Sequence, residues 1–287
     1  MTSPANTPSP RSPDPTRSSP LGIFDSGVGG LSIVREIRHQ LPAEDVVFFA
    51  DQGHVPYGNR SLEEVRSFSS GIVRFLLDQG AKVIVVACNT ASAAALHALR
   101  AEFPALAIVG MEPAVKPAVE TTVTQRVGVL ATPATFQGAL FASVVERFAK
   151  GVEVIESTAP GLVDQIEAGD LEGPETRAIV TQALAPILAR GADTLVLACT
   201  HYPFVIPLLQ EVAGPSVRII DPAPAIARQT GRVLESQGLA MHGAQEGGLT
   251  LWTSGDPNRL AHAAEVLIQE TRPAHQAAWA RGALRPS

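Results

Sequence analysis

The chain contains one short phrase twice, and each copy ends in one of its two cysteines. Residues 80–88 read GAKVIVVAC and residues 191–199 read GADTLVLAC, so five of the nine positions are identical. A small polar residue, Asn89 or Thr200, follows each thiol. A repeat that duplicates a reactive atom indicates two half-structures that present two thiols to one site. Such a geometry suits chemistry that needs a group on each side of a carbon atom.

Short apolar runs alternate with segments of helical periodicity along most of the chain. The apolar runs, each typical of a buried strand, are residues 22–24, 46–50, 83–87, 126–130, 152–155, 194–198 and 249–253. Helical spacing and capping residues predict helices over residues 31–41, 61–79, 136–148, 162–168, 174–190 and 225–237, and an Ala-rich helix soon after residue 88. This alternation predicts an α/β fold, in which helices flank mostly parallel sheets.

The two halves of the chain align beyond the cysteine phrases. Gly22 pairs with Gly128 and Ser26 with Thr132, which predicts two similar lobes related by pseudo-twofold symmetry, with the site between them. The segment from about residue 222 is expected to return to the first lobe. The expected units are a first lobe of residues 21–113 and 222–270, a second lobe of residues 114–221, a disordered Pro/Ser-rich tail of residues 1–20, and a loosely ordered tail of residues 271–287.

Composition argues against several classes of function. Hydrophobic residues make up 45% of the 287 residues, so a sizeable core can form. The net charge is −6 and no basic run stands out, so nucleic-acid binding is not indicated. No apolar run reaches membrane-spanning length, and residues 1–20 lack the apolar core of a secretion signal. A cytoplasmic protein with reduced thiols is therefore the expectation.

The two thiols are expected where parallel α/β sheets bind ligands, beyond the carboxyl ends of the strands. Each is predicted to precede a helix, whose N-terminal N–H groups and dipole stabilise anions and lower the pKa of a thiol. The N–H groups near Asn89, Thr90 and Thr200 could hold a substrate carboxylate. A single cysteine after an apolar strand more often only packs, but the repeat favours a functional pair. Neither a disulfide nor a metal site is indicated.

Several longer motifs, taken in order, match a known family. They are residues 22–31 (GIFDSGVGGL), Asp51 with residues 56–58 (PYG), residues 87–91 (ACNTA), residues 198–203 (ACTHYP) and residues 220–222 (IDP). Over residues 21–265 the chain closely resembles the cofactor-independent glutamate racemases. The resemblance implies interconversion of L- and D-glutamate for peptidoglycan synthesis, with neither pyridoxal phosphate nor a metal. Dimers are common in that family, so a homodimer is an expectation for this chain.

The resemblance also implies roles for five side chains. Cys88 and Cys199 would be the two bases, of which Cys88 would deprotonate D-glutamate and Cys199 L-glutamate. Asp25 resembles the carboxylate that assists Cys88, and His201 resembles the assistant of Cys199. Glu167 resembles a further acidic residue near the second thiol, although by pattern alone it is a solvated helix residue.

Six further positions resemble the substrate contacts of the family. They are Ser26, Tyr57, Gly58, Asn89, Thr90 and Thr200. Tyr57 and Gly58 match a loop at the entrance of the site. The other four carry hydroxyls or an amide, which fit the carboxylates and ammonium group of an amino acid. Ser26 is as well placed to cap a helix as to bind a substrate, and both can be true.

Three other hypotheses stay open at this point. An aspartate or related amino-acid racemase would share the superfamily, although residues 25–27 (DSG) and 199–201 (CTH) favour glutamate. A two-lobed amino-acid binding protein would need no thiols and would usually carry a secretion signal. An enzyme with a single cysteine nucleophile would leave the second cysteine unexplained.

Overall fold

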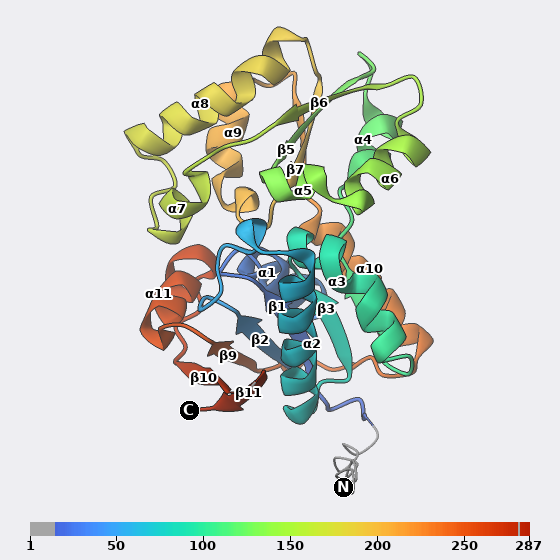
Figure 1. The fold of residues 1–287 in the computed structure, drawn as a ribbon, viewed down its shortest axis with the longest axis vertical. Coiled ribbons are helices and arrows are strands. Elements are labelled where there is room, and N and C mark those ends of the chain that lie inside the picture. The colour runs from blue at the N-terminus through green and yellow to red at the C-terminus, as the bar shows by residue number, and fades with distance from the viewer. Residues whose placement is uncertain (1–14, 281) are drawn as a thin grey trace, which may run out of the picture.

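A computed structural model describes residues 15–280 and 282–287, which form two β-sheets flanked by helices (Figure 1). The larger sheet consists of β1 (Leu21–Asp25), β2 (Val46–Ala50), β3 (Val83–Val86), β4 (Ile108–Gly110), β9 (Leu249–Thr253), β10 (Ala274–Ala280) and β11 (Ala283–Pro286). The smaller sheet consists of β5 (Arg126–Ala131), β6 (Glu153–Ser157), β7 (Thr194–Ala198) and β8 (Arg218–Ile220). Neighbouring strands are parallel, except for the antiparallel pair of β10 and β11.

The smaller sheet repeats the central part of the larger one. Its strand order is β6-β5-β7-β8, which corresponds to β2-β1-β3-β4 within the larger order β11-β10-β9-β2-β1-β3-β4. Cys88 therefore follows β3 in one half, and Cys199 follows the equivalent strand β7 in the other. This order confirms the predicted α/β fold of two similar, mostly parallel halves. The last part of the chain returns to the larger sheet, where β9 pairs with β2.

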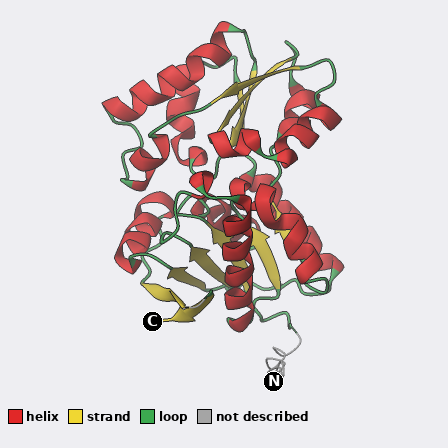
Figure 2. Cartoon of the chain, viewed as in Figure 1, coloured by secondary structure: helices red, strands yellow, loops and turns green. Residues whose placement is uncertain are grey.

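Helices cover both faces of the sheets (Figure 2). On the larger sheet, α1 (Leu31–Gln40), α10 (Ala223–Ser236) and α11 (Pro257–Ile268) pack on one face, and α2 (Leu62–Asp78) and α3 (Asn89–Glu102) pack on the other. Around the smaller sheet lie α4 (Val115–Thr121), α5 (Pro133–Gln137), α6 (Ala139–Phe148), α7 (Leu162–Glu167), α8 (Pro174–Ala189) and α9 (Ile206–Ala213). The apolar strands β1, β2, β3 and β7 are buried over their whole length, which their position between two helix layers requires. Among the described residues, no helix combines the length and apolar character needed to cross a membrane.

Local signals in the sequence account for several element boundaries. Ser61 begins α2 with a capping box, in which its hydroxyl accepts from the Glu64 backbone N–H while the Glu64 carboxylate accepts from the Ser61 N–H. Gly80 follows the same helix with a φ of +83°, a left-handed backbone conformation that residues with a side chain rarely adopt. The single helix predicted over residues 136–148 is instead the pair α5 and α6, because Gly138 adopts extended backbone between them.

The C-terminal segment differs from its prediction. Residues 271–287, expected to be loosely ordered, contain β10, which adds to β9 in parallel, and β11, which pairs with β10. Ala277 and Leu284 are buried there against the larger sheet. At the other end, residues 1–14 of the predicted disordered tail lie outside the described residues. The rest of that tail contacts the fold, since the Arg17 guanidinium donates to the backbone oxygen of Gly238 at 3.0 Å.

A buried ion pair joins segments that are distant in sequence. Lys82, just before β3, lies 2.6 Å from the Glu44 carboxylate, and both side chains are almost fully buried. The Lys82 ammonium also donates to the backbone oxygens of Arg17 at 2.5 Å and Leu239 at 3.0 Å. This one group therefore links the segment before β1, the start of β3 and the loop after α10.

We expect Lys82→Met to reduce the free energy of unfolding by about 3–5 kcal/mol, because it leaves the Glu44 carboxylate buried without its cation. Chemical denaturation followed by circular dichroism measures this loss. The double variant Lys82→Met/Glu44→Leu removes both charges and should recover most of the stability. A single variant as stable as the unmodified chain would contradict this account.

Candidate active site

One cavity of about 460 Å³ lies between the two halves, at the carboxyl ends of their central strands. The described residues around it include ten of the eleven site residues predicted from sequence: Ser26, Tyr57, Gly58, Cys88, Asn89, Thr90, Glu167, Cys199, Thr200 and His201. Asp25 is not in the lining. It is fully buried immediately behind Ser26. The fold thus brings two thiols from equivalent positions to a single cavity of a size suited to a small ligand.

Cys88 lies at the N-terminus of α3. Its sulfur accepts from the backbone N–H of Ala91 at 3.3 Å and lies 3.6 Å from the Ser26 hydroxyl. The N–H at the helix terminus acts to lower the pKa of this thiol, as expected, but the net shift is in the opposite direction. Burial and the nearby Asp25 carboxylate raise the pKa of Cys88 far above its usual value, and they outweigh the opposing hydrogen bond from Ala91. Cys88 is accordingly a protonated thiol at neutral pH.

Cys199 has different surroundings. It is followed by the 3-10 helix η2 (Tyr202–Val205) and not directly by an α-helix, so the predicted helix dipole does not apply to it. Its sulfur lies 3.8 Å from Nδ1 of His201, and Nε2 of the same ring lies 3.1 Å from the Glu167 carboxylate. The Cys199 sulfur, the His201 imidazole and the Glu167 carboxylate therefore lie in contact, one after the other.

The charges of His201 and Glu167 depend on these contacts. Burial alone would lower the pKa of His201, but the hydrogen bonds with Cys199 and Glu167 raise it to about 10. For Glu167 burial acts to raise the pKa, and the bond to His201 reverses the effect and lowers it. His201 is thus cationic at neutral pH, with an anionic Glu167 on one side and the Cys199 sulfur on the other.

Asp25 connects the two halves at the base of the site. Its carboxylate accepts from the backbone N–H groups of Ser26 at 2.8 Å and Gly30 at 2.6 Å, and from the Thr200 hydroxyl at 3.1 Å. Burial raises the pKa of Asp25, and the positive His201 opposes this rise. The carboxylate therefore holds the loop after β1 and a residue of the opposite half in one arrangement.

Close approach of the opposite half explains the glycines after β1. A Cβ on Gly29 would lie 2.5 Å from both the Thr200 hydroxyl and the His201 ring, and a Cβ on Gly27 would lie 2.8 Å from the Glu167 carboxylate. Neither glycine has a positive φ, so the requirement is space and not backbone conformation. His201 and Glu167, which contact Cys199 directly or through each other, pack against the loop that contains Gly27 and Gly29.

Asn89 carries an unused hydrogen-bonding group. Its side chain is 6% exposed and lines the cavity, and neither its amide oxygen nor its nitrogen has a partner among the described residues. A buried amide without partners is costly, and a polar ligand in the cavity would supply them. This side chain favours a ligand that carries both hydrogen-bond donors and acceptors.

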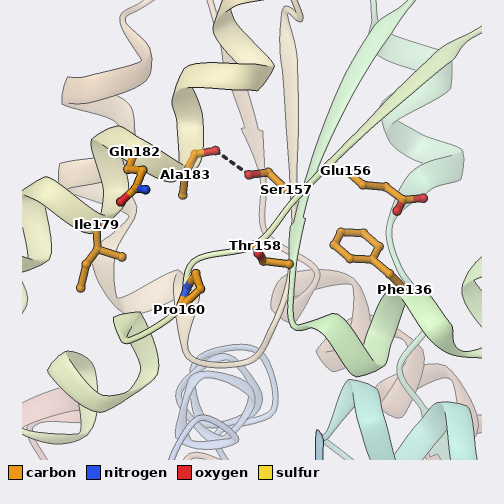
Figure 3. Close-up of a pocket in the computed structure, with 8 residues that line it drawn as sticks. All are labelled: Phe136, Glu156, Ser157, Thr158, Pro160, Ile179, Gln182 and Ala183. Carbon is orange, nitrogen blue, oxygen red and sulfur yellow. Dashed lines mark hydrogen bonds between the residues drawn. The ribbon is translucent and has the colours of Figure 1, made fainter.

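A second hollow of about 660 Å³ opens beside the smaller sheet, and it shares Thr158 and Pro160 with the first cavity. Figure 3 shows Gln182 and Ile179 of α8 on one side of it and Phe136 on the other, with the Ser157 hydroxyl donating to the backbone oxygen of Ala183. Its lining has neither a thiol nor an imidazole. The smaller cavity is therefore the one equipped for proton transfer.

The model of the Asp/Glu/Hydantoin racemase family matches residues 22–230. The chain belongs to this racemase family. Among curated members, it is 51% identical over 250 residues to the glutamate racemase of Pseudomonas aeruginosa (strain UCBPP-PA14), with 87% of this chain and 94% of that protein covered. It is 49% identical over 244 residues to the glutamate racemase of Roseiflexus sp. (strain RS-1), with 85% and 90% covered.

Solved racemase structures share the fold. Glutamate racemase RacE1 from Bacillus anthracis superposes with a TM-score of 0.83 at 31% identity, covering 93% of this chain and 99% of that one. Glutamate racemase from Francisella tularensis, solved in complex with D-glutamate, gives a TM-score of 0.79 at 27% identity, with 92% and 98% covered. The two-sheet architecture is thus the architecture of this racemase family.

Some residues of the racemase site were not predicted. Thr132 and Thr135 line the cavity from the second half, with their hydroxyls 3.1 Å apart. The alignment of the halves pairs Thr132 with Ser26, and this signal could have identified it. Among the described residues, no group of three or more His, Cys, Asp or Glu side chains is arranged to hold a metal ion.

Proposed function

We propose that this chain is a glutamate racemase, an isomerase that interconverts L- and D-glutamate and supplies D-glutamate for peptidoglycan synthesis. The observation that carries the proposal is the single cavity lined by Cys88 and Cys199, each at the same point of a repeated half. The curated relatives that are 48–51% identical to this chain are glutamate racemases, which supports glutamate as the substrate. The proposed chemistry needs no pyridoxal phosphate and no metal.

In the proposed mechanism, each thiol serves one face of the α carbon. A thiolate removes the proton from one face while a protonated thiol returns a proton to the other, and the roles exchange in the reverse direction. The surroundings of the two thiols already differ before substrate binds, because burial and Asp25 raise the pKa of Cys88, whereas the Cys199 sulfur lies 3.8 Å from the cationic His201. By the family resemblance, Cys199 acts on L-glutamate and Cys88 on D-glutamate.

Loss of the α proton creates a carbanion, and in this proposal the polar lining stabilises it. Ser26, Asn89, Thr90 and Thr200 hold the substrate carboxylates and ammonium group. The partnerless amide of buried Asn89 is the strongest sign of such a contact. Hydrogen bonds to the α-carboxylate strengthen as negative charge spreads onto it, and the enclosed site reduces competition from water.

The test of the proposed function is turnover of single enantiomers, followed by the loss of circular dichroism. We expect the purified chain to convert both L- and D-glutamate to the racemic mixture without added cofactor. L-aspartate should react at least about a hundredfold more slowly, because its shorter chain leaves the distal carboxylate unbound. Faster turnover of aspartate would identify the substrate as the shorter amino acid. Binding of glutamate without exchange of its α proton in heavy water would identify a binding protein.

We expect Glu167→Gln to move the alkaline limb of the kcat/KM profile to lower pH. His201, with a pKa of about 10, stays cationic through neutral pH, and its positive charge is lost as the pH rises through that value. Glu167 helps to hold the pKa high, so a neutral amide should lower it towards the usual value of about 6.5. The pH dependence of racemisation from pH 6 to 10.5 measures the shift. An alkaline limb at the same pH in both proteins would exclude this role of Glu167.

The proposal also covers the division of the chain into lobes and its assembly in the cell. We infer that residues 21–113 and 222–270, extended by β10 and β11 of the same sheet, act as one lobe and residues 114–221 as the other, which the separate sheets support. We also infer a cytoplasmic homodimer, on the family resemblance, and sedimentation velocity at several concentrations tests the dimer. No nucleic-acid or membrane partner is part of the proposed function.

A further inference from the structure

Asp51, directly after β2, contacts four other polar side chains. Its buried carboxylate accepts from the Tyr57 hydroxyl at 2.6 Å, the Ser254 hydroxyl at 2.6 Å and the Trp279 indole N–H at 3.0 Å, and it lies 3.0 Å from Nδ1 of His54. These partners come from three segments of the chain. Charge-assisted hydrogen bonds of this kind are among the stronger polar contacts in a protein.

Two of the partners, His54 and Tyr57, belong to the loop of residues 52–60, which forms the mouth of the site. Residues 55–59 of this loop, with Tyr57 at its centre, line the cavity. The Tyr57 hydroxyl donates to Asp51, so Tyr57 cannot donate to a substrate without leaving that carboxylate. At the next residue, a Cβ on Gly58 would lie 3.5 Å from the Cβ of Ala134 in the opposite half. The position of the loop therefore sets both the wall of the cavity and its distance to the other lobe.

Trp279 reaches this cluster from β10, which is far from the thiols in sequence. Its ring lies with its centroid 5.3 Å from that of His54 and 5.8 Å from that of Phe68. A Cβ on Gly71 of α2 would come within 2.6 Å of the indole, so the absent side chain of Gly71 makes room for it. The indole thus occupies a fitted slot that aims its N–H at Asp51.

We propose that Trp279 is a positioning residue for the racemase reaction: through Asp51, the C-terminal strand β10 holds the loop of residues 52–60 in its substrate-binding position. This inference rests on the proposed function for its kinetic test. The carboxylate joins the two sides directly, since Trp279 and Tyr57 donate to the same group. Trp279 touches neither thiol and plays no part in proton transfer.

The test is Trp279→Phe, which keeps an aromatic ring and removes the N–H donor. We expect KM for glutamate to rise about tenfold while kcat stays within about twofold, because the loop is displaced but the thiols and their assistants are not. A purely structural role would lower the thermal midpoint and leave KM of the folded protein unchanged. An unchanged KM would overturn the proposal.

A matched control and a second variant separate positioning from packing. Trp252→Phe makes the same change on β9, where the indole N–H has no hydrogen-bond partner among the described residues, and it should leave KM unchanged. Gly71→Ala displaces the Trp279 indole from a different element, and it should also raise KM. The helix preference of alanine offsets part of the stability that this clash costs. If Trp279→Phe fails to fold, Gly71→Ala decides the matter, and an unchanged KM there overturns the proposal.

A readout independent of activity distinguishes this inference from the proposed function. Arg60 is exposed at the end of the loop, and its guanidinium donates to the backbone oxygen of His54 at 3.2 Å. We expect trypsin to cleave after Arg60 several times faster in Trp279→Phe than in Trp252→Phe. If glutamate is not racemised but this difference is found, the proposed function fails and the positioning of the loop stands. Equal cleavage rates would overturn the positioning role.

Discussion

Replacing either Cys88 or Cys199 by alanine is expected to reduce racemisation at least about 10⁴-fold, because each thiol is the acid or base for one face of the substrate. Neither variant can complete an inversion, since one of the two proton transfers has no carrier. Loss of circular dichroism from L- and D-glutamate measures the effect. Serine variants keep nearly the same size and hydrogen-bonding capacity, and they should be as inactive because a hydroxyl is a far weaker acid than a thiol.

Deuterium exchange assigns each thiol to a face. The variant that retains only Cys199 should exchange the α proton of L-glutamate in heavy water without inverting it, and the variant that retains only Cys88 should do so with D-glutamate. Full racemase activity in either alanine variant would exclude a two-base mechanism. Exchange of the same enantiomer by both variants would exclude the assignment of faces.

Much of the architecture could be predicted because it depends on local patterns. The apolar runs at residues 46–50, 194–198 and 249–253 coincide with β2, β7 and β9. Strands that are apolar throughout must be covered on both faces, and consecutive parallel strands need helical crossovers, so the order of elements follows from few rules. The repeated cysteine phrase then places both thiols at equivalent strand ends.

The elements that escaped prediction depend on partners distant in sequence. The strands β4 and β8 have only three residues each, too few for a periodic signal. β10 contains four alanines and two polar residues besides Trp279, so it has little apolar surface of its own and no periodic pattern. That strand forms because β9 pairs with it and because Trp279 finds both a slot beside Gly71 and a buried acceptor in Asp51.

The same division holds for the site. Cys88, Cys199 and His201 lie within motifs and could be found from the sequence. The high pKa of Cys88 could not, because it arises from burial and from a carboxylate that is 63 positions earlier in the chain. The requirement for glycine at position 29 likewise depends on the His201 ring, which arrives from the opposite half. Spacing identifies the reactive groups, whereas their charge states depend on how the two halves meet.

His201→Asn is expected to lower kcat/KM about a hundredfold, because Cys199 loses the positively charged partner that assists its proton transfer. The two substrates are mirror images with equal free energy, so kcat/KM must fall equally for L- and D-glutamate. The asymmetry of the site should appear instead in the primary isotope effects. With the Cys199 step slowed, the isotope effect on kcat/KM should rise for L-glutamate deuterated at the α carbon and fall for the deuterated D-enantiomer.

Asp25→Asn provides the mirror-image variant. Asp25 lies beside Cys88 and, as its assisting carboxylate, can accept the proton of that thiol when Cys88 acts as the base. Its replacement by Asn should therefore slow the step at Cys88 and raise the isotope effect for deuterated D-glutamate instead. Opposite patterns in the two variants would require that each assistant serves its own thiol. If both variants change the two isotope effects in the same direction, the assistants do not act on separate faces, and the distinct surroundings of Cys88 and Cys199 have no separate catalytic roles. Competitive measurements with α-deuterated glutamate of each hand decide between these outcomes.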